Sequence, residues 1–473
     1  MDLQLRLPDG GAPLFLRLAE GVVAEIDRGR LRPGDALPGT RAVATQLGVH
    51  RNTVIAAWAE LRSQGWIEAQ PGGRTRVCAG LAPTPPARTT SARRAGFDVP
   101  AGPPAELSPE PPPGAWVLAG GRPDVRLFPA DEIGRAWRRA VRDSRGKVLD
   151  YGDPRGHARM RAALAEVSNA HRGLAIGADD VVVTRGAQQA LYLAAHALLR
   201  PGDRVAVERF GYPPAWAALR SAGAELVPID VDSDGMVVDA LEPLAPSLRA
   251  VYLTPHHQFP TMATLPAHRR LQLLALARRH RLAVLEDDYD NEYHFAGRPV
   301  LPLAALDRHG TVVYVGTLSK TLAPGLRLGY LVGPRPLLDA AVARRVVVDR
   351  QGELASELAI ATLIEDGTYA RHLRRTRKIY AARQGAMVDA LTRHLGPSAR
   401  FDRPMGGLAL WVHGGPGVEA WAERAARAGA WIETSARFDL LEQPPVHLRA
   451  GFASLTEAEI DAAVRVLAAT REG

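Results

Sequence analysis

Residues 312–329 read VVYVGTLSKTLAPGLRLG, an apolar strand-like run followed by a loop of small and hydroxyl residues that carries Lys320. Lysine is rare in this chain, because of its 59 Lys and Arg residues only Lys147, Lys320 and Lys378 are lysines. Arginine could supply charge in this loop, but guanidinium stays protonated, whereas a desolvated amine can form a Schiff base with a carbonyl. Lys320 is therefore a candidate nucleophile, although the segment alone also allows a lysine left by chance on a surface loop.

Apolar strand-like runs alternate with helical stretches from Trp116 onward. The runs are Val181–Val183, Val205–Val207, Ala250–Leu253, Leu282–Leu285 and Val312–Val315. This alternation predicts an α/β fold in which a mainly parallel sheet is covered by helices and the chemistry lies in the loops after the strands.

The loops after these runs contain residues that can hold a phosphorylated pyridine. Gly186, Ala187 and Gln188 open a helix, where free backbone amides form an anion site. Tyr212 follows the next run and can stack on a flat ring, although a core or surface tyrosine is the simpler interpretation of it alone.

The run that ends at Leu285 is followed by the carboxylate-rich segment EDDYDNE, residues 286–292. Burying so many carboxylates costs free energy unless a cation or a protonated base pairs with one of them. A pyridinium nitrogen meets that requirement, and the pairing keeps the cofactor an electron sink. A metal ion is the alternative, but no histidine or carboxylate spacing typical of a metal site is evident, so no metal is predicted.

The whole chain has the composition of a globular protein. Its 473 residues suggest two or three domains, with 46% hydrophobic and 23% charged residues. No signal-like start and no apolar run of membrane-spanning length is present, so we expect a cytoplasmic protein. Cys78 is the single cysteine, which excludes an intrachain disulfide and a Cys-rich zinc site.

Residues 79–115 are rich in proline and lack apolar periodicity. Such a segment is typical of an extended linker, partly in the polyproline II conformation. It divides the chain into a small domain, residues 1–78, and a large domain, residues 116–473.

The small domain has the pattern of three helices and a hairpin. Apolar residues at helical spacing predict helices over about 15–26, 40–47 and 51–64, with Thr40 able to cap the second. Residues 66–70 and 75–77 read as two strands joined by a Gly-rich turn. This arrangement predicts a winged helix-turn-helix.

The polar residues of the small domain lie where that geometry would meet DNA. Arg51, Asn52 and Thr53 open the third helix, and Arg41 lies at the start of the second. The first residues of a recognition helix contact base edges, and helix N-termini bind phosphates. Each arginine alone could be a solvated surface charge, so the prediction depends on their joint placement.

The small domain resembles the winged helix of the GntR family. Residues 29–41 (GRLRPGDALPGTR) and 47–54 (LGVHRNTV) match its signature. The resemblance implies that Arg41, Arg51, Asn52 and Thr53 contact a double-stranded operator and that Gly72 and Gly73 let the wing approach the minor groove. Arg74 and Arg76 stand where Gly and Phe are common, and we expect them to add phosphate contacts.

The large domain resembles the fold-type I aminotransferases, and with the winged helix the chain resembles the MocR subgroup of GntR regulators. The matching motifs, in order, are GAQ (186–188), GYP (211–213), TPHHQFPT (254–261), EDDYD (286–290) and SKTLAPGLRLG (319–329). The resemblance implies a smaller C-terminal α+β subdomain and the cofactor pyridoxal 5'-phosphate (PLP).

The resemblance also implies roles for single residues. Lys320 would form the Schiff base with PLP, Asp287 would meet the pyridine nitrogen, Tyr289 the phenolic oxygen and Tyr212 the ring. Arg449 would bind the carboxylate of an amino-acid effector, with a structural salt bridge as the alternative. The residues implied for the phosphate are Gly186, Ala187, Gln188, Thr317 and Arg327, and Tyr151 would reach the phosphate of the partner subunit in a head-to-tail homodimer with shared sites.

One departure from the aminotransferase pattern is evident. The usual Asn-Pro-Thr-Gly is replaced by Phe259–Met262, so the asparagine that bonds the phenolic oxygen is missing. We expect Tyr289 to carry more of that interaction, with His257 or Gln258 as candidate helpers.

Together these features predict a transcription regulator that binds DNA and senses PLP or a PLP adduct of an amino acid or amine. A working aminotransferase with a vestigial DNA-binding domain is the alternative, since Lys320, Asp287 and Arg449 would also serve an enzyme. A third possibility is a sensor of PLP itself.

Overall fold

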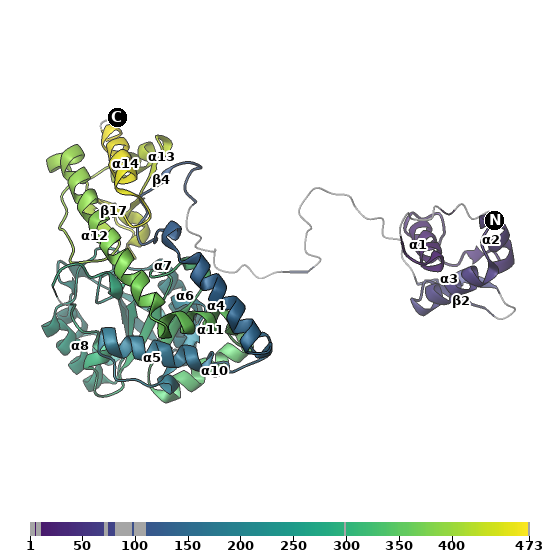
Figure 1. Ribbon diagram of the computed structural model, residues 1–473, viewed down its shortest axis with the longest axis horizontal. Coiled ribbons are helices and arrows are strands. Elements are labelled where there is room, and N and C mark those ends of the chain that lie inside the picture. The colour runs from purple at the N-terminus through teal and green to yellow at the C-terminus, as the bar shows by residue number, and fades with distance from the viewer. Residues whose placement is uncertain are drawn as a thin grey trace. The chain divides into compact units, whose positions relative to one another are not determined.

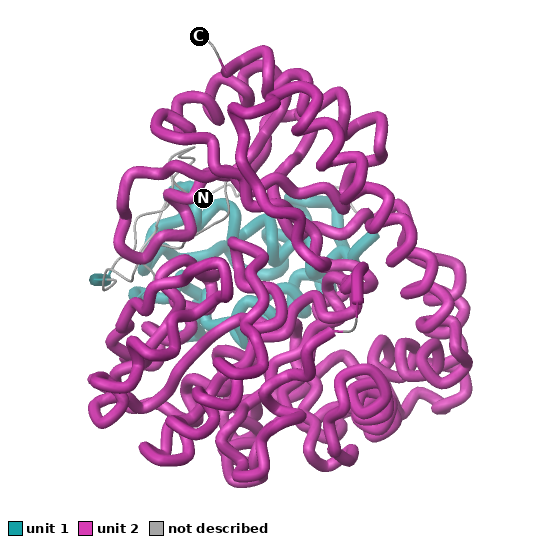
Figure 2. The backbone as a smooth tube through the Cα atoms, turned by 90° about the vertical axis from the view of Figure 1, so that its left-hand side faces the viewer, with its two compact units in different colours: residues 1–103 teal, residues 104–473 magenta. Residues whose placement is uncertain are grey.

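The computed structural model describes residues 5, 11–70, 74–80, 97–98, 110–297 and 299–471. The chain forms two compact units, residues 1–103 and residues 104–473 (Figure 2). Most of the predicted linker, and Gly72 and Gly73 of the wing, lie outside the described residues. None of the helices in the described part of the chain is long and apolar enough to cross a membrane.

The first unit is the predicted winged helix-turn-helix. Its helices are α1 (Leu14–Asp27), α2 (Thr40–Leu47) and α3 (Arg51–Ser63). The strands β1 (Ala36–Leu37), β2 (Ile67–Ala69) and β3 (Thr75–Val77) form an antiparallel sheet in the order β1-β3-β2. Its helices pack around a core that includes Leu18, Val22, Val54, Trp58 and Leu61.

Two details of the helix starts differ from expectation. Gly39, not Thr40, occupies the N-cap position of α2, so Thr40 is already helical and does not cap. His50 caps α3, because its side chain accepts a hydrogen bond from the amide of Asn52. No local pattern indicates this second cap, since histidine is not among the common N-cap residues.

The second unit is built on a seven-stranded sheet in the order β5-β13-β12-β11-β10-β6-β7. All five predicted strands are present, and β13 is the antiparallel member of this sheet. It follows the Lys320 loop directly and, like β7, was not among the predicted strands. The strands are β5 (Val181–Thr184), β6 (Arg204–Glu208), β7 (Glu225–Ile229), β10 (Leu248–Leu253), β11 (Ala283–Asp288), β12 (Val312–Thr317) and β13 (Gly329–Val332).

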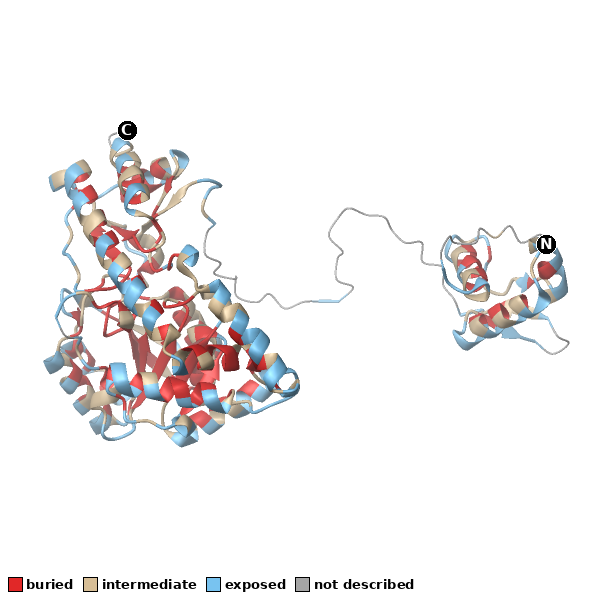
Figure 3. Ribbon diagram, in the orientation of Figure 1, coloured by how far each residue is buried: buried red, intermediate tan, exposed pale blue. Residues whose placement is uncertain are grey.

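Helices cover both faces of this sheet, because successive side chains of a strand point to opposite faces. Val182, Val205 and Tyr252 pack with α6 (Gly186–Leu198), α7 (Pro213–Ser221) and α10 (Arg335–Val348). Val183 and Val284 face the other side, which is covered by α4 (Ala130–Asp143), α5 (Ala158–Arg172), α8 (Ala267–His280), α9 (Leu303–Leu306) and α11 (Leu354–Glu365). Figure 3 shows the buried residues gathered in the sheet.

A smaller C-terminal α+β part completes this unit, as predicted. Its strands β14 (Ala409–His413), β17 (His447–Gly451) and β16 (Glu433–Thr434) form an antiparallel sheet in that order. A parallel pair joins β15 (Ala430–Trp431) to β4 (Trp116–Val117), so the start of the unit packs against its end (Figure 1). The helices of this part are α12 (Thr368–Leu395), α13 (Val418–Arg427) and α14 (Glu457–Ala469).

Candidate functional site

Lys320 lies three residues beyond the end of β12 and lines a cavity of about 1100 Å³, which we call the Lys320 cavity. The loop is held by local hydrogen bonds: the Ser319 amide donates to Thr317 Oγ1 at 3.1 Å, and the Tyr293 hydroxyl donates to the Lys320 carbonyl at 3.2 Å. Burial, reinforced by the charge of Arg449, lowers the pKa of Lys320 to about 8. A substantial fraction of the amine is therefore neutral near physiological pH, as a nucleophile requires.

The carboxylate-rich segment after β11 separates into residues with different partners. Glu286 accepts from the Leu303 and Ala304 amides at 2.8 Å, and Asp288 accepts from the Tyr314 hydroxyl at 2.6 Å. Asp287 is the member that lines the Lys320 cavity.

Asp287 is buried and only half satisfied. Its Oδ2 accepts a hydrogen bond from the Tyr252 hydroxyl at 3.0 Å, whereas Oδ1 has no partner among the described residues. Burial raises the pKa of Asp287 to about 7. A buried carboxylate oxygen without a partner is costly, so this atom is suited to a cationic or protonated donor in the cavity.

Aromatic side chains form one part of the cavity wall. Phe259 lies at their centre, with ring centroids 5.3 Å from Tyr212, 6.0 Å from Tyr289 and 5.3 Å from Phe438, each in an edge-to-face arrangement. The residue that replaces the expected asparagine thus makes this wall apolar. Tyr289 and Tyr212 both line the cavity.

The helper residues suggested for Tyr289 are engaged elsewhere. His257 Nδ1 lies 2.7 Å from Asp290 Oδ1, and Gln258 donates to the carbonyls of Phe210 and Phe259. The Tyr289 hydroxyl instead contacts Met262 Sδ at 3.8 Å. Met262 takes the left-handed φ of +67° that favours glycine, so the loop keeps a glycine-like turn without glycine.

The N-terminus of α6 forms another wall. Ala187, Gln188, Thr317 and Arg327 line the cavity, and Gln188 Oε1 is buried without a partner among the described residues. Gly186 begins α6 but is not part of the lining. A Cβ on Gly186 would lie 3.0 Å from the Arg327 guanidinium, so glycine lets Arg327 pack against the helix start. Free amides and a guanidinium at one place can hold an anion.

Arg449 enters the cavity from β17. It is 1% exposed, and its Nε and Nη2 have no partner among the described residues. Its Cζ lies 4.3 Å from the centroid of the Phe259 ring. The alternative of a structural salt bridge is not supported, because these two nitrogens meet no carboxylate in the described part of the chain. A buried, unpaired cation is suited to an anionic ligand.

Residues near the start of the large unit also reach the cavity, although they are not among the predicted site residues. Gly120, Gly121 and Arg122 belong to the lining, and a Cβ on Gly120 would overlap the Arg449 guanidinium. The Gly120-Gly121 pair was the only local feature that could have suggested a close contact here, but nothing in the sequence connects it to Arg449 in a distant segment. Ser319, beside Lys320, is a further lining residue that was not predicted.

Tyr151 does not join the cavity within this chain. It is 73% exposed, and the Arg350 guanidinium lies 4.0 Å from the centroid of its ring. Its predicted role requires a partner subunit.

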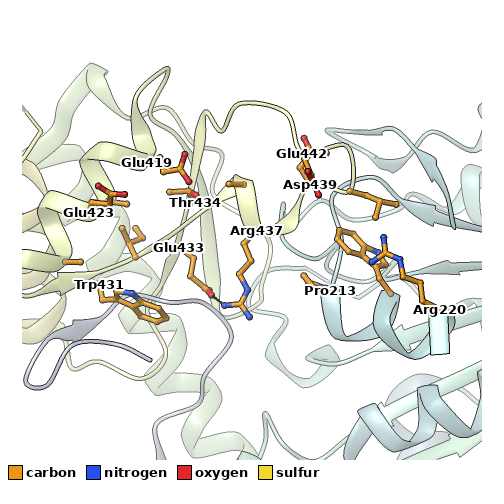
Figure 4. Close-up of a pocket in the computed structure, with 16 residues that line it drawn as sticks. Pro213, Arg220, Glu419, Glu423, Trp431, Glu433, Thr434, Arg437, Asp439 and Glu442 are labelled. Atoms are coloured by element: carbon orange, nitrogen blue, oxygen red, sulfur yellow. Dashed lines mark hydrogen bonds and ion pairs between the residues drawn. The ribbon is translucent and has the colours of Figure 1, made fainter. Parts of the chain in front are cut away.

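A second hollow of about 840 Å³ adjoins the Lys320 cavity and shares Pro213, Trp431, Glu433 and Arg437 with it. Arg437 donates a hydrogen bond to Glu433 at 2.6 Å, drawn as a dashed line in Figure 4. None of the predicted site residues lines this second hollow.

The predicted DNA-contacting residues share one region of the first unit. Arg41, Arg51 and Asn52 are exposed in the first turns of α2 and α3, with Thr53 half-buried beside them. Arg51 Nε lies 3.4 Å from Thr40 Oγ1, so the N-termini of the two helices adjoin.

The two wing arginines differ. Arg74 is exposed. The Arg76 side chain donates to the Gly34 carbonyl at 2.7 Å and to Gln70 Oε1 at 3.0 Å. Arg76 therefore braces the wing through two of its side-chain nitrogens, and its phosphate contact stays a prediction.

Comparison with known proteins agrees with both units. Residues 125–467 match the family aminotransferase class I and II, and residues 15–77 match the bacterial regulatory proteins of the gntR family. The probable rhizopine catabolism regulatory protein MocR of Rhizobium meliloti is 37% identical over 409 residues, covering 85% of this chain and 82% of that protein. The chain belongs to the MocR subgroup of the GntR family.

Other relatives support this membership. The HTH-type transcriptional regulator TauR of Rhodobacter capsulatus is 34% identical to this MocR-type chain over 454 residues, 90% of each protein. The structure of LysN, an α-aminoadipate aminotransferase from Thermus thermophilus complexed with N-(5'-phosphopyridoxyl)-L-leucine, has a TM-score of 0.71 and 29% identity, covering 76% of this chain and 93% of that one. The predicted fold class is confirmed, and a gntR-family domain implies DNA binding.

Proposed function

We propose that this chain is a transcription regulator whose winged helix, within residues 1–78, binds operator DNA and whose large domain, residues 116–473, binds PLP and an amino acid or amine effector. Residues 79–115 would connect the two. The observation that carries the proposal is the cavity in which Lys320, the free Oδ1 of Asp287 and the unpaired guanidinium of Arg449 come together. The exposure of Arg41, Arg51 and Asn52 on the winged helix supports a working DNA-binding domain.

The cavity residues fit PLP, group by group. Asp287 Oδ1 would accept a hydrogen bond from the pyridine nitrogen, and its ionised form would keep that nitrogen protonated. When bound, PLP supplies an aldehyde for amines and an electron-withdrawing ring. Tyr212 and Tyr289 would contact the ring and its phenolic oxygen.

The phosphate would lie at the start of α6. The residues proposed to hold it are Gly186, Ala187, Gln188, Thr317 and Arg327, of which the last four line the cavity. Helix amides and a guanidinium hold the dianion by hydrogen bonds and charge.

Arg449 is the proposed carboxylate site for an effector. Its Nε and Nη2 lack partners among the described residues, and the ring of Phe259 below the guanidinium holds it in place without neutralising it. A carboxylate would accept two parallel hydrogen bonds from such a fork.

We further propose a homodimer with shared sites. Tyr151 is exposed and outside the cavity of its own chain, which is consistent with a contact to the phosphate of a partner. Val346, Val347 and Val348 of α10 are 46%, 87% and 53% exposed, an apolar patch that a second copy would cover.

Effector binding would shift a population of dimer states. A ligand that bridges Lys320 and Arg449 favours whichever arrangement of the large unit it binds better, and the wings of the dimer would then sit differently on DNA.

Replacing Lys320 by alanine tests the proposal. The variant should lose the near-visible absorbance that the wild-type protein acquires with PLP and should lose its response to effector, while operator binding persists. Gel-shift and absorbance measurements on the full-length chain provide both readouts. If the wild-type protein takes up no PLP, the proposal is wrong.

An active aminotransferase is the second candidate, favoured by the presence of Lys320, Asp287 and Arg449 in one cavity of an aminotransferase fold. Multiple turnover of an amino acid with a 2-oxo acid would support the enzyme, whereas a bound amino acid that is not turned over would support the sensor.

Arg449→Met separates an amino-acid sensor from a sensor of PLP alone. The variant should still bind PLP but lose the response to the amino acid, because the carboxylate site is gone. Since the charge of Arg449 lowers the pKa of Lys320, PLP uptake should also require higher pH in the variant than in the wild type. A switch of DNA binding by PLP alone that survives the substitution would favour the PLP sensor.

A further inference from the structure

Three buried histidines meet outside the Lys320 cavity, although their spacing in the sequence does not indicate a metal site. His256 and His257 follow β10, and His294 follows the short turn Asn291–Tyr293 after β11. Each offers a ring nitrogen, and these nitrogens all lie within 4.8 Å of one another. The three side chains are 3%, 1% and 5% exposed. None of them lines the cavity that holds Lys320.

Most ring nitrogens of this His256/His257/His294 cluster make no hydrogen bond to the described residues. Both nitrogens of His256 and Nε2 of His257 have no hydrogen-bond partner among the described residues, and the only described interaction of the His294 ring nitrogens is with the backbone of Ala296. Buried polar atoms are nearly always hydrogen-bonded, because leaving one unsatisfied is costly, so this concentration of free nitrogens requires an explanation.

His257 is oriented as a metal ligand would be. Its Nδ1 lies 2.7 Å from Asp290 Oδ1, which fixes the proton on Nδ1 and leaves the Nε2 lone pair free. A carboxylate behind a histidine is the usual support of a metal-bound imidazole. Asp290 Oδ2 is also buried and has no partner among the described residues.

We propose that the His256/His257/His294 cluster binds a divalent transition-metal ion, zinc in the first place, with the three imidazoles as ligands and Asp290 behind His257. Imidazole is a preferred donor for zinc and its neighbours in the first transition row. Tetrahedral coordination with Zn–N bonds of about 2.0–2.1 Å requires the nitrogens to approach by on the order of an ångström, which side-chain rotation supplies.

The surrounding charges are compatible with a cation. Arg270 and Arg172 are the cationic side chains that act on His256. Both arginines are paired: Arg270 with Glu286 at 3.8 Å, and Arg172 with Asp288 at 3.4 Å and Glu292 at 2.5 Å. Arg377, which also acts on His294, is exposed to solvent. Neutral imidazoles are the form that coordinates metal.

The metal would join distant parts of the chain. His256 and His257 belong to the loop that continues to Phe259 and Met262, and His294 makes an isolated β-bridge with Gly406, just before β14 of the C-terminal part. The ion would thus hold the Phe259 loop against the segment that leads into β14. This is independent of the proposed regulatory function, because the cluster uses none of the cavity residues.

Cobalt and zinc titrations of the full-length, chelator-treated protein test the proposal. We expect one Co²⁺ per chain with the intense visible bands of a tetrahedral nitrogen-ligand site, displaced by an equivalent of Zn²⁺, and a rise in the thermal midpoint on Zn²⁺ addition. X-ray absorption of the zinc form should count three imidazoles. The absence of stoichiometric binding, or a spectrum without imidazole, would overturn the proposal.

Variants assign the binding to these residues. His256→Asn and His294→Asn should each abolish stoichiometric binding, and Asp290→Asn should weaken it about 10- to 100-fold. The exposed His309→Asn and the cavity variant Lys320→Ala are controls that should bind as the wild type does. Unchanged binding in both histidine variants would refute the site. If these variants do not fold, the X-ray absorption spectrum of the wild-type zinc form tests the proposal, and a spectrum without imidazole ligands refutes it.

Discussion

At the scale of single residues, burial and mutual electrostatic interaction shift the pKa values of two groups in the Lys320 cavity. Burial raises the pKa of Asp287 to about 7 and lowers that of Lys320 to about 8, and each group opposes part of the shift of the other. Outside the cavity lining, Glu208 accepts hydrogen bonds from the Thr254 amide and hydroxyl, and burial likewise raises its pKa to about 7. Perturbed groups in one cavity are typical of a functional site, and here they stand ready for a charged ligand.

Asp287→Asn should make the ligand-free protein more stable at high pH. The wild-type carboxyl has a folded pKa of about 7 against an ordinary 3.8, so its favourable contribution is complete below about pH 4 and is lost as pH rises from there to about 7. At pH 8 the variant should gain roughly 1–4 kcal/mol in unfolding free energy, and near pH 4 it should match the wild type. Denaturant unfolding at the two pH values measures the difference.

The exposed Asp234→Asn serves as the control and should change little at either pH. Equal stabilisation by Asp287→Asn at pH 4 and pH 8 would contradict the electrostatic reason. With PLP present, the wild type should be more stable than Asp287→Asn at pH 8, because the variant cannot hold the pyridine nitrogen in its protonated form.

Among the elements, loops after strands and helix starts carry the function. The Phe259–Met262 loop turns through a left-handed Met262 and puts an aromatic ring under Arg449 where the aminotransferase pattern has asparagine. In the first unit, the adjoining starts of α2 and α3 place Arg41, Arg51 and Asn52 on the surface. Helix N-termini attract phosphates through their free amides and dipole, and cationic side chains there add to the effect.

Arg51→Ala should weaken operator binding, and Arg62→Ala should not. Both arginines are exposed on α3, but Arg51 lies in its first turn and Arg62 in its last. Loss of a phosphate or base contact should cost about 1–3 kcal/mol and, for a phosphate, should reduce the salt dependence of the affinity by about one ion. Fluorescence anisotropy with operator DNA over a salt series measures both quantities, and equal losses for the two variants would place the contact elsewhere.

At the scale of the molecule as a whole, the proposed DNA binding and the proposed ligand binding belong to different compact units, residues 1–103 and residues 104–473. The proposed homodimer would form between large units, in which Tyr151 and the valines of α10 are exposed. Exposed apolar patches of this kind are typical of interaction surfaces.

Val347→Glu should therefore dissociate the dimer. Val347 is 87% exposed, and a charge buried in an apolar interface without a partner costs several kcal/mol. Leu271→Glu on α8, at a residue 58% exposed, is the matched control and should leave the assembly intact. Sedimentation velocity separates the two species, and a Val347→Glu protein that stays dimeric would place the interface on another face.

Local patterns in the sequence were enough to predict five strands of the large sheet, the winged helix and the order of the motifs, because periodicity, turns and helix starts are local properties. They did not predict β7 and β13 of that sheet. They also singled out Lys320, just after β12, and the carboxylate-rich segment at the end of β11, where parallel strands deliver side chains to one edge, whereas the choice of Asp287 within that segment came from the family resemblance. Thr40 proved not to be the cap of α2, and Arg76 bonds to the Gly34 carbonyl, since neither the cap at Gly39 nor this bond could be foreseen.

Which groups meet depends instead on tertiary packing. Gly120 lies against Arg449 with Phe259 beneath the guanidinium, and among the carboxylates of residues 286–292 it is Asp287 that keeps a free oxygen in the Lys320 cavity. His294 joins His256 and His257 only in the folded chain. Such contacts join segments that are far apart in the sequence. Local patterns cannot predict these contacts, because the contacts arise from how the sheet brings its loops together.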